Sequence, residues 1–253
     1  MQLPHWNRLA DHAKQLRDIH LRELFDNDPQ RFDKFSITSN PLLVDYSKNR
    51  ITEETRSLLV ELAREAELEA WRDKMFAGEI INNTEQRAVL HTALRNPASS
   101  QVSTEVEREL AHMEALCEKL QNGQWLGYNN SPITDIIVIG IGGSYLGPKL
   151  ACEALKSYAA DNISIHFVAN IDAHVLDDVL TRVSAESTLF VVISKSFSTQ
   201  ETTENALTAA NWIRRQSGNE SCIEKQFVAI TSNSDAARKF GIADENILSM
   251  WDW

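Results

Sequence analysis

The chain of 253 residues is long enough for one large domain or two small ones. Hydrophobic residues make up 43% of it and charged residues 24%, the proportions of a globular protein with a sizeable core. Its net charge of −11, without any block of lysine or arginine, excludes nucleic acid as the main partner. A small anionic ligand is still allowed, because a local cluster of backbone amides can bind an anion in an acidic protein.

No apolar run approaches the length of a membrane span, and the first residues lack the basic and apolar regions of a signal peptide. We therefore expect a cytoplasmic protein with no membrane partner. The three cysteines, Cys117, Cys152 and Cys222, show neither a CxxC motif nor zinc-ligand spacing. They are predicted to be reduced thiols in the core, with no metal site, and a catalytic cysteine is the less favoured alternative.

The first 130 residues carry mainly helical patterns, in which apolar side chains recur every three or four positions. Cap residues mark where several of these helices start. In chain order the predicted elements are a helix over 6–25, a short helix capped by Asp28, a strand over 42–47, a helix from Thr52 to Gly78, a helix from Thr84 to Leu94 and a helix over 102–120. This part is predicted to be a helical segment over 1–130.

After residue 130 the pattern changes to short apolar runs that alternate with helical stretches. Strands are predicted over 136–140, 163–168, 189–193, 227–231 and from 247, and helices over 148–158, 173–182, 200–216 and 234–240. Such alternation predicts a doubly wound parallel sheet, here an α/β domain over 131–253. Ligands of these sheets bind beyond the carboxyl ends of the strands, where polar turns at 140–147 and 194–199 are expected.

The turn at 194–199 has the character of an anion site. It follows a strand predicted to be buried on both faces, and it contains four hydroxyls and a single charge, that of Lys195. Ser198 and Glu201 are spaced as a capping box at the start of the next helix, whose free amides and dipole favour an anion. We predict a phosphate here. The alternative is that the hydroxyls only cap the helix, whereas a Ser194–Lys195 nucleophile pair is disfavoured because adjacent strand residues point to opposite sides.

The glycine-rich turn at 140–147 fits neither of two known phosphate-binding motifs. Tyr145 occupies the third glycine position of a dinucleotide fingerprint, and Pro148 displaces Lys149 from the lysine position of a P-loop. Glycines still let backbone amides approach a ligand, and Ser144 adds a hydroxyl. A tight turn without a ligand is the equally weighted alternative.

Four other positions carry weaker signals. His91 is interpreted as a core histidine, and His174, just past a strand end, as a residue of a helix start rather than a ligand contact. Asp45 and Lys48 are interpreted as a solvated pair. Glu201 could act as a base, but capping explains it without chemistry.

The segments 139–148 and 193–202 resemble those of the glucose-6-phosphate isomerase family. Further stretches that resemble this family lie at 45–49, 75–79, 84–91 and 93–96. The resemblance covers nearly the whole chain. It implies a flavodoxin-like, three-layer α/β/α sugar-isomerase domain preceded by a helical segment.

Members of the family interconvert glucose 6-phosphate and fructose 6-phosphate in glycolysis and gluconeogenesis, through a cis-enediol and without metal or organic cofactor. The resemblance therefore implies a hexose 6-phosphate substrate and, for the full-length enzyme, a homodimer. The substrate-binding positions that it implies are Gly143, Ser144, Ser194, Lys195, Ser196, Phe197, Ser198 and Thr199. Many members have threonine at positions 196 and 198 and aspartate at 145. The Gly-Thr that often follows the Asp of 170–174 is absent, so His174 receives no role.

Family members are longer and carry a second sugar-isomerase domain. Trp251, Asp252 and Trp253 resemble the segment before a Gly-Gly-Arg motif, and the two indoles lead us to expect buried structure beyond them. The arginine, the glutamate base and the ring-opening histidine and lysine of the family would then follow residue 253. We expect the 253-residue chain to bind substrate without turning it over and assign it no catalytic residue. The alternative is a non-catalytic sugar-phosphate-binding module with a regulatory role.

Overall fold

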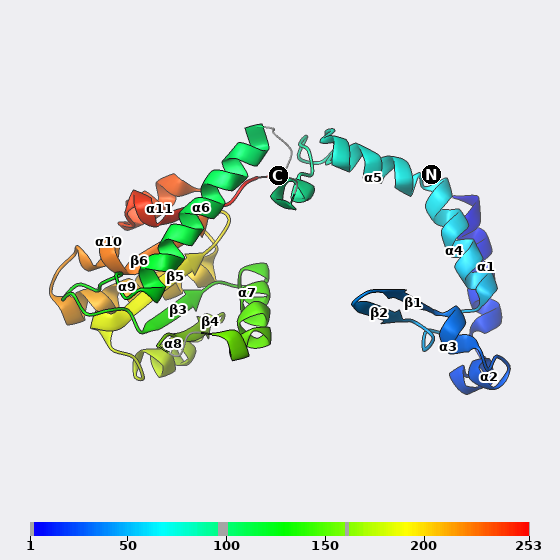
Figure 1. The fold of residues 1–253 in the computed structure, drawn as a ribbon, viewed down its shortest axis with the longest axis horizontal. Coiled ribbons are helices and arrows are strands. Elements are labelled where there is room, and N and C mark those ends of the chain that lie inside the picture. The colour runs from blue at the N-terminus through cyan, green and yellow to red at the C-terminus, as the bar shows by residue number, and fades with distance from the viewer. Residues whose placement is uncertain (1–2, 96–100, 160–161, 253) are drawn as a thin grey trace. The chain divides into compact units, whose positions relative to one another are not determined.

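The computed structural model describes residues 3–95, 101–159 and 162–252, which leaves Trp253 of the terminal Trp-Asp-Trp sequence outside the described residues. The chain forms two compact units, over 1–91 and 92–253 (Figure 1). The sequence pattern changes at 130/131 instead. The two boundaries differ because α6 (Gln101–Gln121), although helical like the residues before it, packs on the sheet that follows it.

The second unit is built on a five-stranded parallel sheet in the order β4-β3-β5-β6-β7. Its strands are β3 (Asp135–Ile139), β4 (Ser164–Val168), β5 (Thr188–Ile193), β6 (Phe227–Thr231) and β7 (Ile247–Ser249). Counted within the unit, this is the flavodoxin-like order 2-1-3-4-5. The predicted strands and the doubly wound sheet are confirmed.

Helices cover both faces of this sheet and connect its strands (Figure 1). The α-helices after α6 are α7 (Gly143–Ala154), α8 (Ala173–Leu180), α9 (Gln200–Ser217), α10 (Cys222–Gln226) and α11 (Ser234–Phe240). Short 3₁₀ segments are η2 (Lys156–Tyr158), η3 (Ala185–Ser187) and η4 (Asp244–Asn246). Helices α8, α9 and α11 match the predictions, whereas α10 was not predicted. The helix expected over 148–158 instead begins five residues before Pro148, which lies inside α7, and its last part is the separate segment η2.

The two faces of the sheet follow from the alternation of side chains along β5. Phe190 points to one face, where its ring stacks on Phe227 at 4.7 Å and α9 lays buried alanines against the strands. Leu189 points to the other face, towards Leu116 of α6 and Trp125. Burial on both faces explains why this strand is apolar throughout, and it gives the three-layer α/β/α architecture that the resemblance implies.

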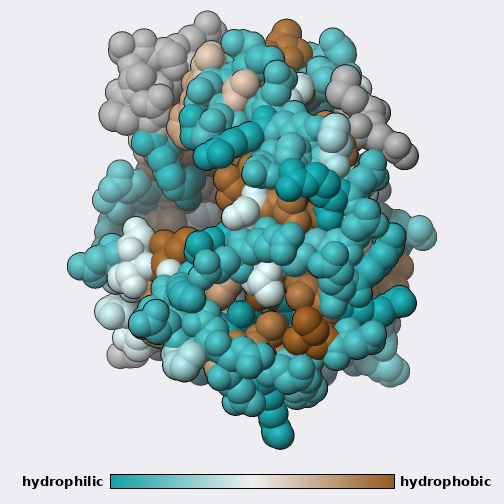
Figure 2. All heavy atoms as spheres, turned by 90° about the vertical axis from the view of Figure 1, so that its right-hand side faces the viewer, coloured by the Kyte–Doolittle hydropathy of each residue, from teal (hydrophilic) through white to brown (hydrophobic). Residues whose placement is uncertain are grey.

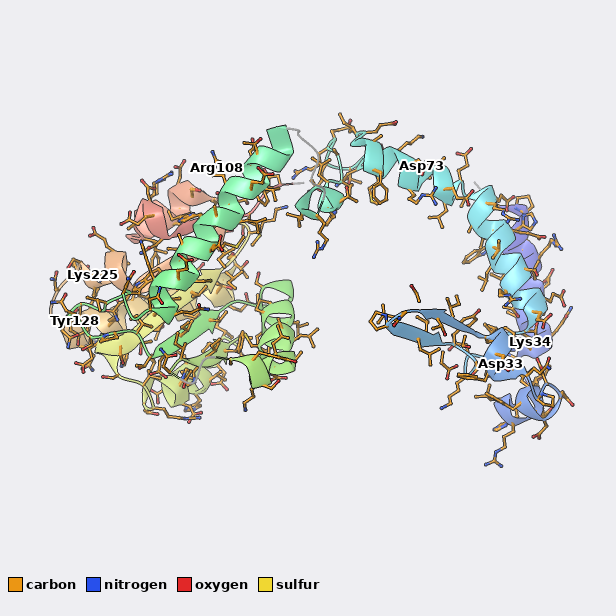
Figure 3. The ribbon with its side chains drawn as sticks, viewed as in Figure 1. Asp33, Lys34, Asp73, Arg108, Tyr128 and Lys225 are labelled. Atoms are coloured by element: carbon orange, nitrogen blue, oxygen red, sulfur yellow. The ribbon has the colours of Figure 1, made fainter. Side chains whose placement is uncertain are left out.

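Polar contacts also hold α6 on the sheet. Glu109 of α6 is only 6% exposed and accepts a hydrogen bond from the amide of Ser249 at 2.5 Å. The ring of His112 bonds the carbonyl of Glu245 at 2.8 Å. Figure 3 shows α6 with Arg108 labelled on it. These contacts explain why α6 belongs to the unit of the sheet.

The first unit consists of helices and one hairpin. Its elements are α1 (Pro4–Leu16), α2 (Leu21–Asp26), α3 (Arg31–Lys34), β1 (Ser36–Ser39), β2 (Leu42–Asp45), α4 (Glu53–Glu65) and α5 (Leu68–Ala77), followed by η1 (His91–Arg95) at the boundary. Helices α1 and α4 pack on each other. Figure 2, which faces this unit, shows separate hydrophobic patches within a mainly hydrophilic surface.

A buried arginine organises the turn region of the first unit. Arg31 is 2% exposed, and its guanidinium donates to the carbonyls of Ser47, Asn49 and Ile51 at 2.7–2.9 Å. The same group lies 4.6 Å from the ring centre of Phe35. Because three carbonyls and a ring surround it, the charge is stabilised although the described residues supply no carboxylate partner.

Several predictions for the first unit are corrected by the structure. The helix predicted over 6–25 is divided into α1 and α2, because His20 accepts the amide of Arg22 and starts a new helix. The short helix begins at Arg31 rather than after Asp28, because Asp28 instead accepts the amide of Gln30 and pairs with Lys34, a residue labelled in Figure 3. A hydrogen bond to Glu53 and a second one to Asp28 raise the pKa of Lys34. The helix from Thr52 to Gly78 is divided at Glu67, whose φ of +54° is left-handed.

The helix predicted to start at Thr84 is absent from the described residues. The hydroxyl of Thr84 instead donates a hydrogen bond to the side-chain oxygen of Asn82 at 2.8 Å, within a turn closed by an antiparallel β-bridge between Asn82 and Arg87. The carboxamide of Asn82 also accepts the amide of Glu85, so a side chain replaces the first turn of a helix.

The cap of α4 offers a stability test with a matched control. Thr52 accepts the amide of Thr55 and donates its own amide to the hydroxyl of Thr55. Thr52→Ala is expected to lower the free energy of unfolding of the first unit by about 1 kcal/mol. Thr84→Ala should change it by less than about 0.5 kcal/mol, because no helix starts there. Urea denaturation of both variants checks this, and equal effects would contradict the assignment of the cap.

Candidate functional site

The two polar turns predicted from the sequence lie side by side at the carboxyl edge of the sheet. Strands β3 and β5 are neighbours in register, with Ile139 opposite Val192. A side chain on Gly140 would place its Cβ 3.2 Å from the carbonyl oxygen of Ile193 and 2.9 Å from that of Ser144. Glycine is therefore required where the turn after β3 passes the end of β5.

The turn after β3 leads directly into α7. Gly142 adopts a φ of +58°, a conformation that favours glycine, and the helix begins at Gly143. Gly143 and Ser144 thus lie in the first turn of a 12-residue helix. The amide of Ser144 donates to the carbonyl of Ile141, whereas no acceptor for the amide of Gly143 was found among the described residues. Gly143 is exposed and Ser144 is half-buried. Both residues can face a ligand at this edge.

Tyr145 has a structural partner on each side. Its ring meets the edge of Phe167 on β4 at 5.9 Å, and its hydroxyl accepts a hydrogen bond from Lys149 at 2.8 Å. That hydrogen bond raises the pKa of Lys149. The bulky ring fills the gap between α7 and the sheet, which is why this turn cannot follow the dinucleotide fingerprint.

The loop of residues 194–199, here called the serine loop, joins β5 to α9. Ser194 is 4% exposed, and its amide donates to the carbonyl of Ile230 on β6. Its hydroxyl lies 3.4 Å from that of Thr199. Lys195 and Ser196 are exposed, and the Lys195 ammonium lies 4.0 Å from Asp252. The loop thus presents one cation and several hydroxyls at the surface.

Ser198 does not cap α9, contrary to the predicted capping box. The helix begins at Gln200 after Thr199, which makes no side-chain cap hydrogen bond, and the hydroxyl of Ser198 donates to Ser196 at 2.8 Å. The left-handed conformation of Phe197, with φ +53°, turns the chain so that Ser198 lies too early for the cap. Glu201, half-buried in the first turn of α9, therefore has no capping role either.

Several loop amides are available to an anion. The amide of Phe197 donates to the carbonyl of Ser194, but no hydrogen bond within the described parts of the chain uses the amides of Ser196, Ser198 or Thr199. Helix α9, 18 residues long, adds the unpaired amides of its first turn and the positive end of its dipole. Amides, hydroxyls and an ammonium group converge here in the way that phosphate binding requires.

The turn after β6 belongs to this site, although the sequence analysis gave it no role. Thr231, Ser232 and Asn233 hydrogen-bond the carbonyls of Lys195 and Ser196. The signal in the sequence was a third polar run, Thr-Ser-Asn-Ser, after a strand that ends at the same edge.

The weaker candidates are placed as follows. His174 is at the start of α8, where its amide donates to Asp172, as predicted. His91 is exposed, so its assignment to the core is wrong. Asp45 accepts the amide of Ser47, and hydrogen bonding by Ser47, with only a minor effect of Lys48, lowers the pKa of Asp45.

The cysteines do not form one class. Cys222 is buried, as predicted, but Cys117 is exposed and Cys152 is half-buried, because α6 and α7 present these positions towards their outer sides. No group of three or more metal-ligating side chains was found among the described residues. In the same residues no helix is both long and apolar enough to cross a membrane.

Fold and site together define a flavodoxin-like α/β protein that gathers hydroxyls, backbone amides and the Lys195 ammonium group at the carboxyl edge of its sheet. A profile of the phosphoglucose isomerase family matches residues 45–253. The chain is 48% identical over 255 residues to glucose-6-phosphate isomerase of Shewanella pealeana, covering 98% of this chain and 46% of that protein. The enzyme of the same name from Pseudoalteromonas translucida is 44% identical over 259 residues, covering 100% and 47%.

Among solved structures, a glucose-6-phosphate isomerase from Chlamydia trachomatis matches with a TM-score of 0.79 and 26% identity, covering 98% of this chain and 48% of that one. The chain belongs to the phosphoglucose isomerase family. It spans about half the length of the curated relatives that it matches.

Proposed function

We propose that this chain provides the phosphate- and sugar-binding part of a glucose-6-phosphate isomerase. The observation that carries the proposal is the serine loop, with unused amides, hydroxyls and Lys195 gathered at the start of α9 in a member of this family. In this proposal Ser194, Lys195, Ser196, Phe197, Ser198 and Thr199 bind the phosphate of a hexose 6-phosphate. Gly143 and Ser144, across the contact between Gly140 and Ile193, face the sugar.

The chemistry of these residues is binding and orientation. Isomerisation between an aldose and a ketose moves a proton between C1 and C2, and it needs a base beside those atoms. No hydrogen bond in the described residues joins a histidine or carboxylate to a hydroxyl of the serine loop, so none of these hydroxyls has an activating base. The loop therefore anchors the phosphate, and the anchored end fixes where the sugar carbons lie.

A coupled assay with glucose-6-phosphate dehydrogenase tests this division of roles. A polypeptide of residues 1–253 is expected to bind glucose 6-phosphate but not to form it from fructose 6-phosphate, because general acid–base catalysis contributes roughly 10²–10⁴-fold and the loop supplies none. Calorimetry measures the binding. A full-length relative serves as the positive control. Turnover that scales with the polypeptide and disappears in Lys195→Ala would contradict the proposal.

A regulatory module that only senses sugar phosphate is the second candidate. The family match begins at residue 45 and so includes much of the helical segment, which a sensing domain would not need. This observation favours the isomerase. The homodimer and the cytoplasmic location expected from the sequence stay predictions.

A further inference from the structure

The turn between β6 and α11, here called the clamp turn (residues 231–233), donates hydrogen bonds to the backbone carbonyls of the serine loop. The carbonyl of Lys195 accepts three hydrogen bonds from it, from the amide of Ser232 at 2.9 Å, the Ser232 hydroxyl at 2.7 Å and the Thr231 hydroxyl at 3.0 Å. The side-chain amide of Asn233 donates to the carbonyl of Ser196 at 3.1 Å. Two successive carbonyls are thereby turned towards the clamp turn.

The direction of these carbonyls determines the direction of an amide. In a trans peptide the C=O and N–H of one unit point in opposite directions, and the Lys195 carbonyl shares its unit with the amide of Ser196. Fixing that carbonyl towards the clamp turn therefore points the Ser196 amide away from it. Ser196 is exposed, so its amide faces the open side of the loop.

A further contact fixes the bend of the loop. Phe197 has a φ of +53°, a left-handed conformation that is unfavourable for a non-glycine residue and needs support from its surroundings. Its ring meets that of Phe240, at the end of α11, at 5.9 Å. The element that starts with the clamp turn thus contacts the serine loop at three consecutive residues, Lys195, Ser196 and Phe197.

We propose that Ser232 and Asn233 are positioning residues, which set the Ser196 amide towards the phosphate without touching the ligand. This inference rests on the proposed function. In this proposal the clamp turn preorganises the serine loop. Because the carbonyls of Lys195 and Ser196 are already hydrogen-bonded, the loop does not need to reorient its peptide groups when an anion binds. Without these bonds the Lys195–Ser196 peptide can rotate, and part of the binding free energy is then spent on ordering it.

Calorimetric titration with glucose 6-phosphate and, separately, with inorganic phosphate tests the proposal on the full chain. Ser232→Ala is expected to weaken binding of both by about fivefold, the value of one modest hydrogen bond. Ser232→Ala combined with Asn233→Ser should weaken it by more than about tenfold, since two donors are lost. The serine at 233 can still cap α11, as the Asn233 side chain does by accepting the amide of Ala236.

Two matched variants separate positioning from general damage. Ser232→Thr keeps the hydroxyl and should bind within about twofold of the unchanged chain. Ser234→Ala removes a neighbouring hydroxyl that makes no hydrogen bond found in the described residues, and it should have no effect. Because Ser232 is exposed, its removal should leave the melting temperature nearly unchanged while the affinity falls.

An NMR titration gives a readout that a purely structural role would not move. The Ser196 amide proton is expected to shift downfield as phosphate saturates the chain, and this shift should be smaller in Ser232→Ala at saturation. Unchanged affinity in the Ser232→Ala, Asn233→Ser double variant overturns the proposal. If Lys195→Ala with Ser196→Ala also leaves binding unchanged, or if the unchanged chain binds neither ligand, the proposed function fails and the positioning role fails with it.

Discussion

The Lys195→Ala, Ser196→Ala double variant is expected to lose the rise in melting temperature that glucose 6-phosphate gives the unchanged chain. A ligand that binds only the folded state stabilises it in proportion to the logarithm of its concentration over the dissociation constant. Removing a charge-assisted partner costs about 1.5–3 kcal/mol, roughly 10- to 150-fold in affinity, so a ligand concentration just above the dissociation constant no longer stabilises the variant. Differential scanning fluorimetry at several ligand concentrations measures the effect.

A control with the same loss of charge is available in the same unit. Lys225→Ala with Ser221→Ala also removes one ammonium and one hydroxyl, and Lys225 is exposed on α10, away from the carboxyl edge (Figure 3). This control should keep the full thermal shift. If glucose 6-phosphate raised the melting temperature of the Lys195→Ala, Ser196→Ala variant as much as that of the Lys225→Ala, Ser221→Ala control, the phosphate would not bind at the serine loop.

Gly127→Ala is expected to be the most destabilising of the single substitutions considered. A Cβ at Gly127 would lie 1.8 Å from the carbonyl oxygen of Glu186 and 2.9 Å from its carbonyl carbon. Both atoms belong to the backbone of η3, so no side-chain rotation relieves the clash. The segment has to move, and overpacking of this kind costs about 1–3 kcal/mol or more.

The clash also disturbs a buried polar contact. Gln226 is fully buried and donates to the carbonyls of Ala185 and Thr188 at 2.7 Å each, while its oxygen accepts the amide of Tyr128 at 2.8 Å. Moving η3 breaks at least one of these hydrogen bonds, and an unsatisfied buried group adds roughly 1–3 kcal/mol. We expect a total loss of about 3 kcal/mol or more in the free energy of unfolding, measured by urea denaturation.

Gly147→Ala is the matched control for this substitution. Gly147 lies inside α7, and a Cβ there would meet no described atom within 4 Å apart from its chain neighbours and the backbone of its own helix. Alanine is the better helix former by about 1 kcal/mol, but its Cβ is crowded by the ring of Pro148, so the two effects oppose each other and the stability should change by less than about 1 kcal/mol. If Gly127→Ala were as stable as the unchanged chain, the close approach of Gly127 to η3 would be wrong.

Local signals in the sequence were sufficient for most elements of the second unit. The three central strands, β3, β5 and β6, are short apolar runs rich in β-branched residues and mostly buried, and each is followed by turn residues and a helical period, as at β5 and α9. The cap at Thr52 was also predicted correctly from the sequence, since a threonine directly before an acidic helical stretch is typical of a helix N-cap.

Predictions failed where contacts between distant residues, or an unusual backbone angle, outweighed local preference. Thr84 has the same side chain as Thr52, but here the side chain of Asn82 accepts the hydrogen bond from the amide of Glu85, and a β-bridge between Asn82 and Arg87 closes the turn. Ser198 has the spacing of a capping residue, but the left-handed Phe197 and its contact with Phe240 shift the helix start to Gln200. The first effect is a competition between two neighbouring cap side chains, and the second depends on a contact with Phe240, which lies far along the chain, so neither follows from the cap spacing alone.

The sequence by itself determined the alternating α/β pattern, the position of the serine loop and the resemblance to the family, because these depend on short stretches of neighbouring residues. Only the tertiary structure decided that α6 packs on the sheet, that Gly140 passes Ile193 so that two turns meet, and that Ser232 and Asn233 hold the serine loop. The physical reason is that such contacts join residues far apart in the chain, and their geometry exists only after the strands have paired in register.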